Sequence, residues 1–267
     1  MRLPCLRLSV LGLITPALGL LAACNPAVSG DVAGGSTTGT SGSFDKAAVV
    51  SYAHVLMTIT SATSTVGWKA NGIAKSSGTT YLARFSNDTV RFASGSPLVT
   101  FEVTNGGTTR FLSEARLLVD GQKYAAFAFG VIGSTDPNLV PNFLLAPLDT
   151  LTPAAGKAHV RFAHLMPNVG PVDVWSGAPG SEIKVATALA YGGITAYADI
   201  QAATALVASI NVTVTPTGLA PNAGTNIMTV IGVSNVTNPS AYTLGLLFTL
   251  SNASIATTRT IAIYQDR

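Results

Sequence analysis

Cysteine is nearly absent from this sequence: the 267 residues contain only Cys5 and Cys24. Both lie at the very start of the chain, so no intrachain disulfide can form in the residues that follow them. The stability of any fold further along must therefore come from burial rather than from covalent cross-links.

Charged residues are scarce as well, at 10% of the chain. Lysine and arginine form no cluster, which excludes the electrostatic footprint of a nucleic-acid-binding protein. No apolar stripe of helical period persists past about ten residues, so long amphipathic helices are not expected. Glycine, serine, threonine, alanine and valine abound instead, a composition that suits β-rich secreted domains.

The N-terminus has the features of a targeting signal. Two arginines, Arg2 and Arg7, precede an almost wholly apolar run over residues 8–21. That order is typical of a signal peptide, and the run is shorter than the roughly 20 residues that span a bilayer. Without the two arginines the chain carries 13 basic and 12 acidic residues, so the remaining charge is close to balanced.

The end of this signal, Leu21-Ala22-Ala23-Cys24, resembles the lipobox of bacterial lipoproteins. The resemblance implies cleavage between Ala23 and Cys24 and attachment of diacylglycerol to the Cys24 thiol, with acyl chains such as palmitate as the membrane anchor. An ordinary signal peptide with a chance cysteine is the alternative. Asn25 is not the aspartate that resembles an inner-membrane retention signal, so we expect an outer-membrane lipoprotein of the cell envelope, on its periplasmic or its surface face.

Four segments follow from the sequence. Residues 1–23 are the expected signal peptide, and residues 24–44 are the lipidated cysteine with a Gly/Ser/Thr-rich flexible tether. Residues 45–152 and 157–267 are two copies of one unit. The motif around His54 recurs around His164 at an offset of 110, and Gly130-Val131 matches Gly232-Val233 at an offset of 102. The smaller second offset places about eight extra residues in the first copy.

Each copy is expected to be a run of short strands. Val99, Phe101 and Val103 alternate with polar residues, as a strand with one buried face does. Turn signals such as Asp120-Gly121 and Asp136-Pro137 separate such runs. The pattern predicts an all-β protein with two tandem antiparallel β-sandwiches, immunoglobulin-like or transthyretin-like, after the signal peptide and tether.

The second copy carries a resemblance to a known family. It reads Val160-Arg161-Phe162-Ala163-His164, then Val172-Asp173-Val174-Trp175, and later Ala190-Tyr191-Gly192 with Thr195 and Tyr197. This resembles domain-of-unknown-function family 4397, whose members are secreted or lipid-anchored envelope proteins, often with tandem sandwiches. Met166, Asn168 and Trp175 depart from its usual pattern. The family supplies no catalytic residues.

Residues with catalytic potential are few. A Gly-x-Ser-x-Gly nucleophile motif is absent, and no cysteine or acidic cluster accompanies the histidines, so we expect no cofactor and no metal. His54 and His164 are interpreted as backbone hydrogen bonders at the end of a sandwich core, with metal binding or pH sensing as alternatives. Asp173 is interpreted as a strand-edge or turn hydrogen bonder.

The two tryptophans are the remaining candidates for binding. Trp68 and Trp175 stand at roughly equivalent places in the two copies. Exposed aromatic rings on sandwiches stack on sugars or anchor partners, while buried rings fill cores. Both interpretations stay open from the sequence.

Three functions compete. The first is a non-enzymatic, lipid-anchored binding or adhesion module for an envelope protein or glycan. The second is a structural envelope or surface-layer spacer, and the third is a hydrolase built around one histidine. The sequence favours them in that order, because anchor, tether and repetition are clear and catalytic groups are not.

Overall fold

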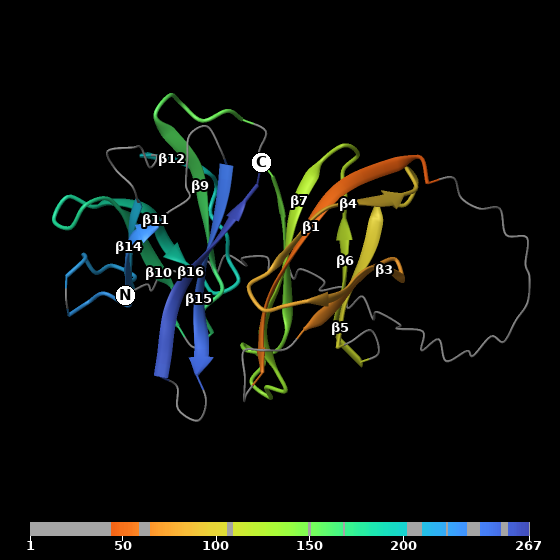
Figure 1. The fold of residues 1–267 in the computed structure, drawn as a ribbon, viewed down its shortest axis with the longest axis horizontal. Helices are drawn as coiled ribbons and strands as arrows, with labels where there is room; N and C mark the ends of the chain where they lie inside the picture. Colours follow the sequence, from red (N-terminus) through yellow and green to blue (C-terminus); the bar gives the residue numbers. More distant parts are fainter. Residues whose placement is uncertain are drawn as a thin grey trace, which may run out of the picture. The chain divides into compact units, whose positions relative to one another are not determined.

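The computed structural model describes residues 44–58, 65–105, 109–148, 151–167, 169–201, 210–222, 224–233, 241–251 and 256–266. These residues form sixteen β-strands and no helix, which confirms the expected all-β class (Figure 1). The expected signal peptide and nearly all of the tether lie outside the described residues.

The strands fall into two sets of eight along the chain. The first set is β1 (Lys46–Thr58), β2 (Val66–Ala70), β3 (Ile73–Thr79), β4 (Arg84–Phe92), β5 (Leu98–Asn105), β6 (Thr109–Leu117), β7 (Lys123–Ile132) and β8 (Asn142–Pro147). The second set is β9 (Lys157–His164), β10 (Val172–Ser176), β11 (Ile183–Leu189), β12 (Ala198–Gln201), β13 (Ile210–Pro216), β14 (Met228–Val233), β15 (Ala241–Ser251) and β16 (Ala256–Gln265). Among the described strands no pairing joins one set to the other.

Each set builds two four-stranded sheets with the same strand order. The first half contains β4-β1-β7-β8 and β3-β2-β5-β6, and the second contains β12-β9-β15-β16 and β11-β10-β13-β14. Every strand of the first half thus has one counterpart in the second, and the internal repeat extends over the whole topology.

One strand pair in each half departs from the antiparallel expectation. β1 runs parallel to β7, and β9 runs parallel to β15. The partners are separated by several intervening strands, and such a long connection permits parallel pairing, whereas a tight hairpin does not. The other described pairs are antiparallel.

The strand pairing corrects the second part of the repeat alignment. His54 pairs with Ala128, and His164 pairs with Leu246, so β7 corresponds to β15. Gly232 lies in β14 and is not the counterpart of Gly130, which lies in β7. The extra residues therefore belong to the second copy and not to the first. A short Gly-Val motif is too common in a β-rich sequence to define the register of a repeat.

Each half has its own core between its two sheets. In the first half Val99, Phe101 and Val103 point into it, as their alternation predicts, and Trp68 and Tyr52 fill its centre. In the second half the core includes Phe162, Val174 and Val214, together with nine other buried residues.

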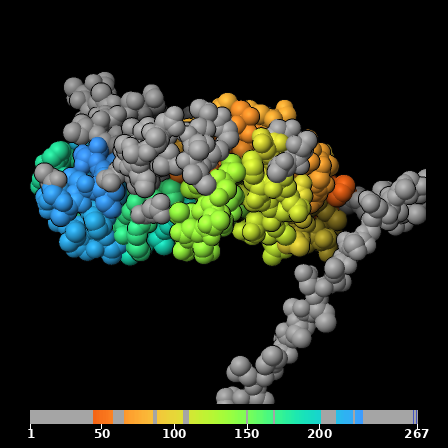
Figure 2. All heavy atoms as spheres, turned by 90° about the horizontal axis from the view of Figure 1, so that it is seen from below, coloured from red at the N-terminus to blue at the C-terminus, as the bar shows by residue number. Residues whose placement is uncertain are grey.

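A third buried cluster, which was not predicted from the sequence, joins the two halves. Ala53, Phe127 and Phe129 of β1 and β7 pack with Ala163 of β9 and Tyr264 of β16. The central strands are therefore covered on both faces, and such strands read as continuous apolar runs instead of alternating ones. In Figure 2, lime-green atoms from the end of the first half adjoin teal atoms of the second.

Candidate functional site

The predicted lipidation site cannot be placed in the structure. Ala23 and Cys24 lie outside the described residues. Within the part that is described, no helix has the length and apolarity needed to cross a membrane.

The paired histidines occupy matching buried positions. His54 and His164 are both 0% exposed. The backbone N–H of Leu56 donates to Nδ1 of His54 at 3.2 Å, and the N–H of Met166 donates to Nδ1 of His164 at 3.3 Å. With Nδ1 accepting, the proton of a neutral His164 ring lies on Nε2, which donates to the carbonyl of Gly170 at 3.2 Å. These contacts are those of residues that organise the backbone.

The surroundings of these histidines contain few other ionisable groups that could share a ligand with them. Among the described residues no group of three or more His, Cys, Asp and Glu side chains could hold a metal ion. Burial lowers the pKa of His164, and the carbonyls of Gly170 and Val169 offset only part of that effect. His164 therefore resists protonation in the folded protein.

The two tryptophans are not equivalent, which corrects the sequence interpretation. Residues 66–70 of β2 and 172–176 of β10 show the same sequence of buried and half-buried positions. Trp68 corresponds to Val174, and Trp175 lies one residue further along and points to the opposite face of its sheet. A difference of one residue in a strand moves a side chain to the other face of the sheet. Approximate spacing therefore could not decide whether the two tryptophans share a face.

Their environments differ accordingly. Trp68 is fully buried, and its indole offers no face to a ligand. Trp175 is half-buried on the outer face, where its Nε1–H donates to Oγ1 of Thr215 at 3.0 Å. The ammonium of Lys184 lies 4.7 Å from the centre of the Trp175 ring, as in a cation–π pair. The ligand-binding hypothesis for a tryptophan now concerns Trp175 alone.

Asp173 accepts hydrogen bonds, as expected, but it lies within β10, an inner strand of its sheet, and not at a strand edge. Its carboxylate is fully buried and accepts hydrogen bonds from Lys184 Nζ at 2.6 Å, from the Ala188 N–H at 2.8 Å and from the Gly218 N–H at 3.0 Å. Burial alone would raise the pKa of Asp173, but these hydrogen bonds and the charge of Lys184 outweigh it and the pKa is lowered.

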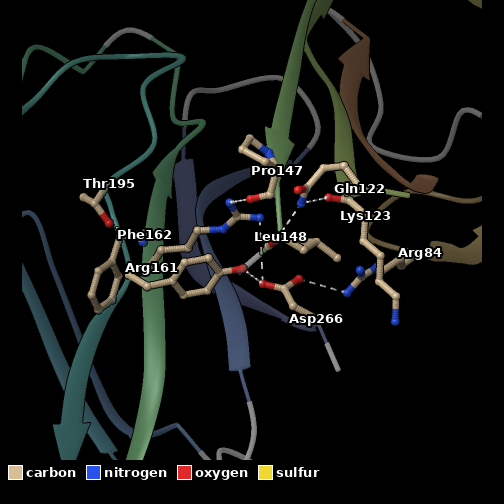
Figure 3. A network of polar contacts seen from close by, with 10 residues as sticks. Arg84, Gln122, Lys123, Pro147, Leu148, Arg161, Phe162, Thr195 and Asp266 are labelled. Atoms are coloured by element: carbon tan, nitrogen blue, oxygen red, sulfur yellow. Dashed lines mark hydrogen bonds and ion pairs between the residues drawn. The ribbon is translucent and has the colours of Figure 1, made fainter. Parts of the chain in front are cut away.

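A charged network spans the boundary between the halves. Asp266, whose side chain is fully buried, accepts a hydrogen bond from Tyr197 OH at 2.6 Å and one from Arg84 Nη1 at 3.3 Å. Arg161 Nη2 lies 3.8 Å from the same carboxylate, and its Nη1 donates to the carbonyl of Pro147 at 2.8 Å. Figure 3 shows Asp266 between the two guanidinium groups.

The network continues over aromatic faces. The Arg161 guanidinium lies 4.6 Å from the centre of the Tyr197 ring. The ring of His159 stacks on Tyr197 at 4.9 Å with planes 7° apart, and Nδ1 of His159 lies 2.6 Å from the Asp199 carboxylate. Arg161 is only 3% exposed, and its guanidinium group is held by the Asp266 carboxylate, the Pro147 carbonyl and the Tyr197 ring.

A cavity of about 490 Å³ opens beside this network, within the size range of ligand pockets. The first half lines it with Gln122 and residues 145–148, and the second half lines it with Arg161 and residues 194–197. We call it the seam cavity. Its wall is mostly apolar, with a few polar groups, which is the usual composition of a small-molecule site.

Neither this cavity nor the role of Arg161 was predicted from the sequence. Arg161 lies inside the family-like motif, yet the motif gave no reason to single it out. A usable signal was present, because a charged residue stands directly between the apolar residues Val160 and Phe162. Such a residue is buried only when partners are available, and its partner Asp266 lies at the other end of the second copy.

Neither a comparison with protein-family models nor one with curated protein sequences gives a match.

Proposed function

We propose that this chain is a lipid-anchored protein of the bacterial cell envelope, held by acyl chains on Cys24, and that its folded part is a non-enzymatic binding module. The signal sequence ending in Ala23-Cys24 is the observation that carries the anchor. Two or more acyl chains hold a protein stably at a membrane, whereas one binds only reversibly. The resemblance to domain-of-unknown-function family 4397 fits the same location.

The binding role is supported by the described residues. The paired histidines are occupied by backbone contacts, and Asp173 accepts hydrogen bonds from the N–H groups of Ala188 and Gly218. The seam cavity and the outer face around Trp175 are open to other molecules. A cavity and a half-buried aromatic ring can bind a partner, such as another envelope component or a glycan, without catalysing a reaction.

The anchor is tested by labelling cells with a clickable fatty acid. The wild-type chain should carry the label, and Cys24→Ser should lose it while Cys5→Ser should keep it. Label on the Cys24→Ser chain would refute the anchor. Protease shaving of intact cells then distinguishes a surface face from a periplasmic face.

The binding role is tested separately by cross-linking in cells followed by pull-down, together with a glycan array. A partner whose capture falls with Trp175→Ala, compared with Trp68→Phe as a core control, would support binding at the outer face. If loss of the protein changes envelope mechanics while neither assay captures a partner, the structural spacer is the better description.

A further inference from the structure

One end of the first half gathers exposed apolar side chains. Nine large apolar residues are exposed in the described part of the chain, and five of them belong to this end. They are Phe44, Ile73, Leu98, Leu117 and Val119, each 51% to 66% exposed. We call these five residues the apolar end. Single exposed apolar residues are ordinary on a protein surface, whereas a cluster of them marks an interaction site.

The strand directions bring these residues to the same end. In one sheet the start of β1 lies beside the end of β4, as Figure 1 shows. In the other sheet β5 starts beside the ends of β2 and β6, with Leu98 paired to Leu117. Ile73 follows the short turn after β2, and Asn71 in that turn exchanges hydrogen bonds of 2.8 and 2.9 Å with Thr100 of β5.

The first described residue is part of this surface. Phe44 lines a hollow of about 300 Å³ together with Ile73 and Arg91. Asp45, which follows Phe44 directly, accepts the N–H of Ser94 at 2.8 Å in the turn between β4 and β5. The start of the described chain is therefore held against the turn that leads to Leu98.

The turn that carries Val119 is held at the same place. The Val119 N–H donates to the hydroxyl of Tyr124 at 3.0 Å. The next residue, Asp120, accepts the Ala47 N–H at 3.0 Å, and its carboxylate lies 3.1 Å from Lys46 Nζ. Val119 thus lies beside the first residues of β1, and the carboxylate next to it is paired with a cation.

The expected tether joins the folded part through this end. Nineteen residues, 25–43, connect Cys24 to Phe44. Their Gly/Ser/Thr-rich composition predicts a mean reach of about 25 Å. Acyl chains on Cys24 keep the apolar end within about this distance of the membrane, and a short flexible linker gives an effective concentration in the millimolar range. A lipid surface is thus the nearest apolar phase, and even a weak contact with it becomes populated.

The second half lacks the aromatic member of this surface. The offset of 110 between β1 and β9 places Ala154 at the position of Phe44. Ile183 is the counterpart of Ile73, because each starts the strand that follows β2 or β10, and it is 63% exposed against 60% for Ile73. Ile183 therefore offers a matched control at the same position of the other half.

We propose that the apolar end lies against the lipid surface to which Cys24 is anchored, with its five side chains at the boundary between headgroups and acyl chains. Apolar faces of peripheral proteins enter a membrane to about this depth. The exposed Arg91 in the hollow beside Phe44 would then lie at the level of the lipid phosphates, which a guanidinium group binds well. This inference rests on the proposed lipid anchor and adds that the first half has a fixed orientation on the membrane.

The test uses the full mature chain, in which Cys24 is the only cysteine. Its thiol is coupled to a maleimide phospholipid in vesicles of phosphatidylcholine and phosphatidylglycerol, so that lipid attachment does not depend on processing in cells. Leu117→Trp adds a fluorescent reporter to the apolar end, far along the chain from the tether. Ile183→Trp adds the same reporter to the second half.

Bromine atoms on the acyl chains quench tryptophan emission only at close range. The emission that Leu117→Trp adds to that of the coupled parent should fall at least about twofold when brominated phosphatidylcholine is used, because the ring enters the lipid. The emission that Ile183→Trp adds should be unchanged by bromine, although acrylamide in the water should quench it.

A second set of variants tests the apolar side chains themselves. Ile73→Ser combined with Val119→Ser in the Leu117→Trp chain should remove most of the bromine quenching, because two of the five contacts with lipid are lost. Both positions are exposed, so the core is unaffected. Ile183→Ser in the same reporter chain is the control and should leave the quenching unchanged.

Equal bromine quenching of the Leu117→Trp and Ile183→Trp chains, or quenching of neither, would overturn the membrane contact. Quenching that persists undiminished with both serines would overturn it too. If the serines instead weaken self-association of the uncoupled Cys24→Ser chain in sedimentation, and bromine quenching is absent, the apolar end is an interface between copies. Fatty-acid labelling of Cys24 in cells is a separate measurement, so failure of this inference is distinguishable from failure of the anchor.

Discussion

The ring of Tyr191 meets the ring of His164 edge-on, with centroids 6.0 Å apart and planes at 77°. Tyr81 and His54 repeat this arrangement in the first half, at 6.0 Å and 84°. In the second half the N–H of Gly192 also donates to the carbonyl of His164 at 2.7 Å. Each histidine lies in a central strand, β1 or β9, and each tyrosine lies in the turn before the edge strand, β4 or β12. The same contact between strand and turn therefore occurs in both halves.

The burial of His164 predicts a dependence of stability on pH. Because burial lowers the pKa of His164 below 6.5, the unfolded chain binds a proton at pH values where the folded chain does not. The contribution to the free energy of unfolding is fully present above pH 6.5 and is lost as the pH falls from 6.5 toward the folded pKa. Urea denaturation of the mature chain at pH 7.5 and 5.5 measures it.

His164→Gln is the matched variant for this measurement. It removes the titrating group, so the difference in unfolding free energy between the two pH values should shrink, even if the chain is less stable at both. An unchanged difference would assign the pH dependence to other groups.

Gly192 is expected to tolerate no side chain. Its φ is +75°, and an added Cβ would lie 3.0 and 3.3 Å from two ring atoms of Phe129 in the other half. Gly192→Ala should therefore cost about 1–2 kcal/mol for the left-handed backbone and a further loss from the displaced ring. Gly218→Ala, at a φ of +84° with nothing within 4 Å, has only the backbone cost. Equal losses measured by urea denaturation would contradict the contact.

The fold class was accessible from the sequence because alternation has a local cause. At Val99, Phe101 and Val103 every second side chain enters a core, and that pattern is visible in a few residues. The seam cavity has no local signature, since its wall combines residues 145–148 with residues 194–197. Its existence depends on how two sheets pack, which a single strand does not encode.

The tryptophans show that an approximate repeat spacing does not predict which face of a sheet a side chain occupies. The repeat was recognised, yet Trp68 and Trp175 differ in register by one residue, and only the strand pairing shows that they face opposite ways. Arg161 was hidden for another reason, because its buried charge has its partner Asp266 far along the chain.

Asp173 is expected to stabilise the second half. Asp173→Ala removes the acceptor of the Ala188 and Gly218 N–H groups, so we expect a loss of about 1–3 kcal/mol, measured by urea denaturation at pH 7. Because the pKa of Asp173 is lowered, its contribution is present above pH 3.8 and is lost as the pH falls through the folded pKa. Glu114→Gln, which removes an exposed ion pair with Arg116, should change stability by less than about 0.5 kcal/mol. Similar losses in both variants would contradict the role of Asp173.

The two tryptophans should be separable by fluorescence, because the chain contains no others. Trp68 is fully buried beside Tyr52, and its Nε1–H has no hydrogen-bond partner among the described residues. Trp175→Phe, which keeps Trp68, should emit at short wavelength and resist acrylamide. Trp68→Phe, which keeps Trp175, should emit at longer wavelength and be quenched readily.

Stability should separate them as well. Trp68→Ala leaves a large void in the core and should cost about 3–5 kcal/mol, whereas Trp68→Phe should cost less, because no hydrogen bond of the indole is lost. Trp175→Ala removes a half-buried ring and should cost less than Trp68→Ala. If acrylamide quenches both single-tryptophan chains equally, the two indoles share one environment, and the register that places them on opposite faces of their sheets is wrong.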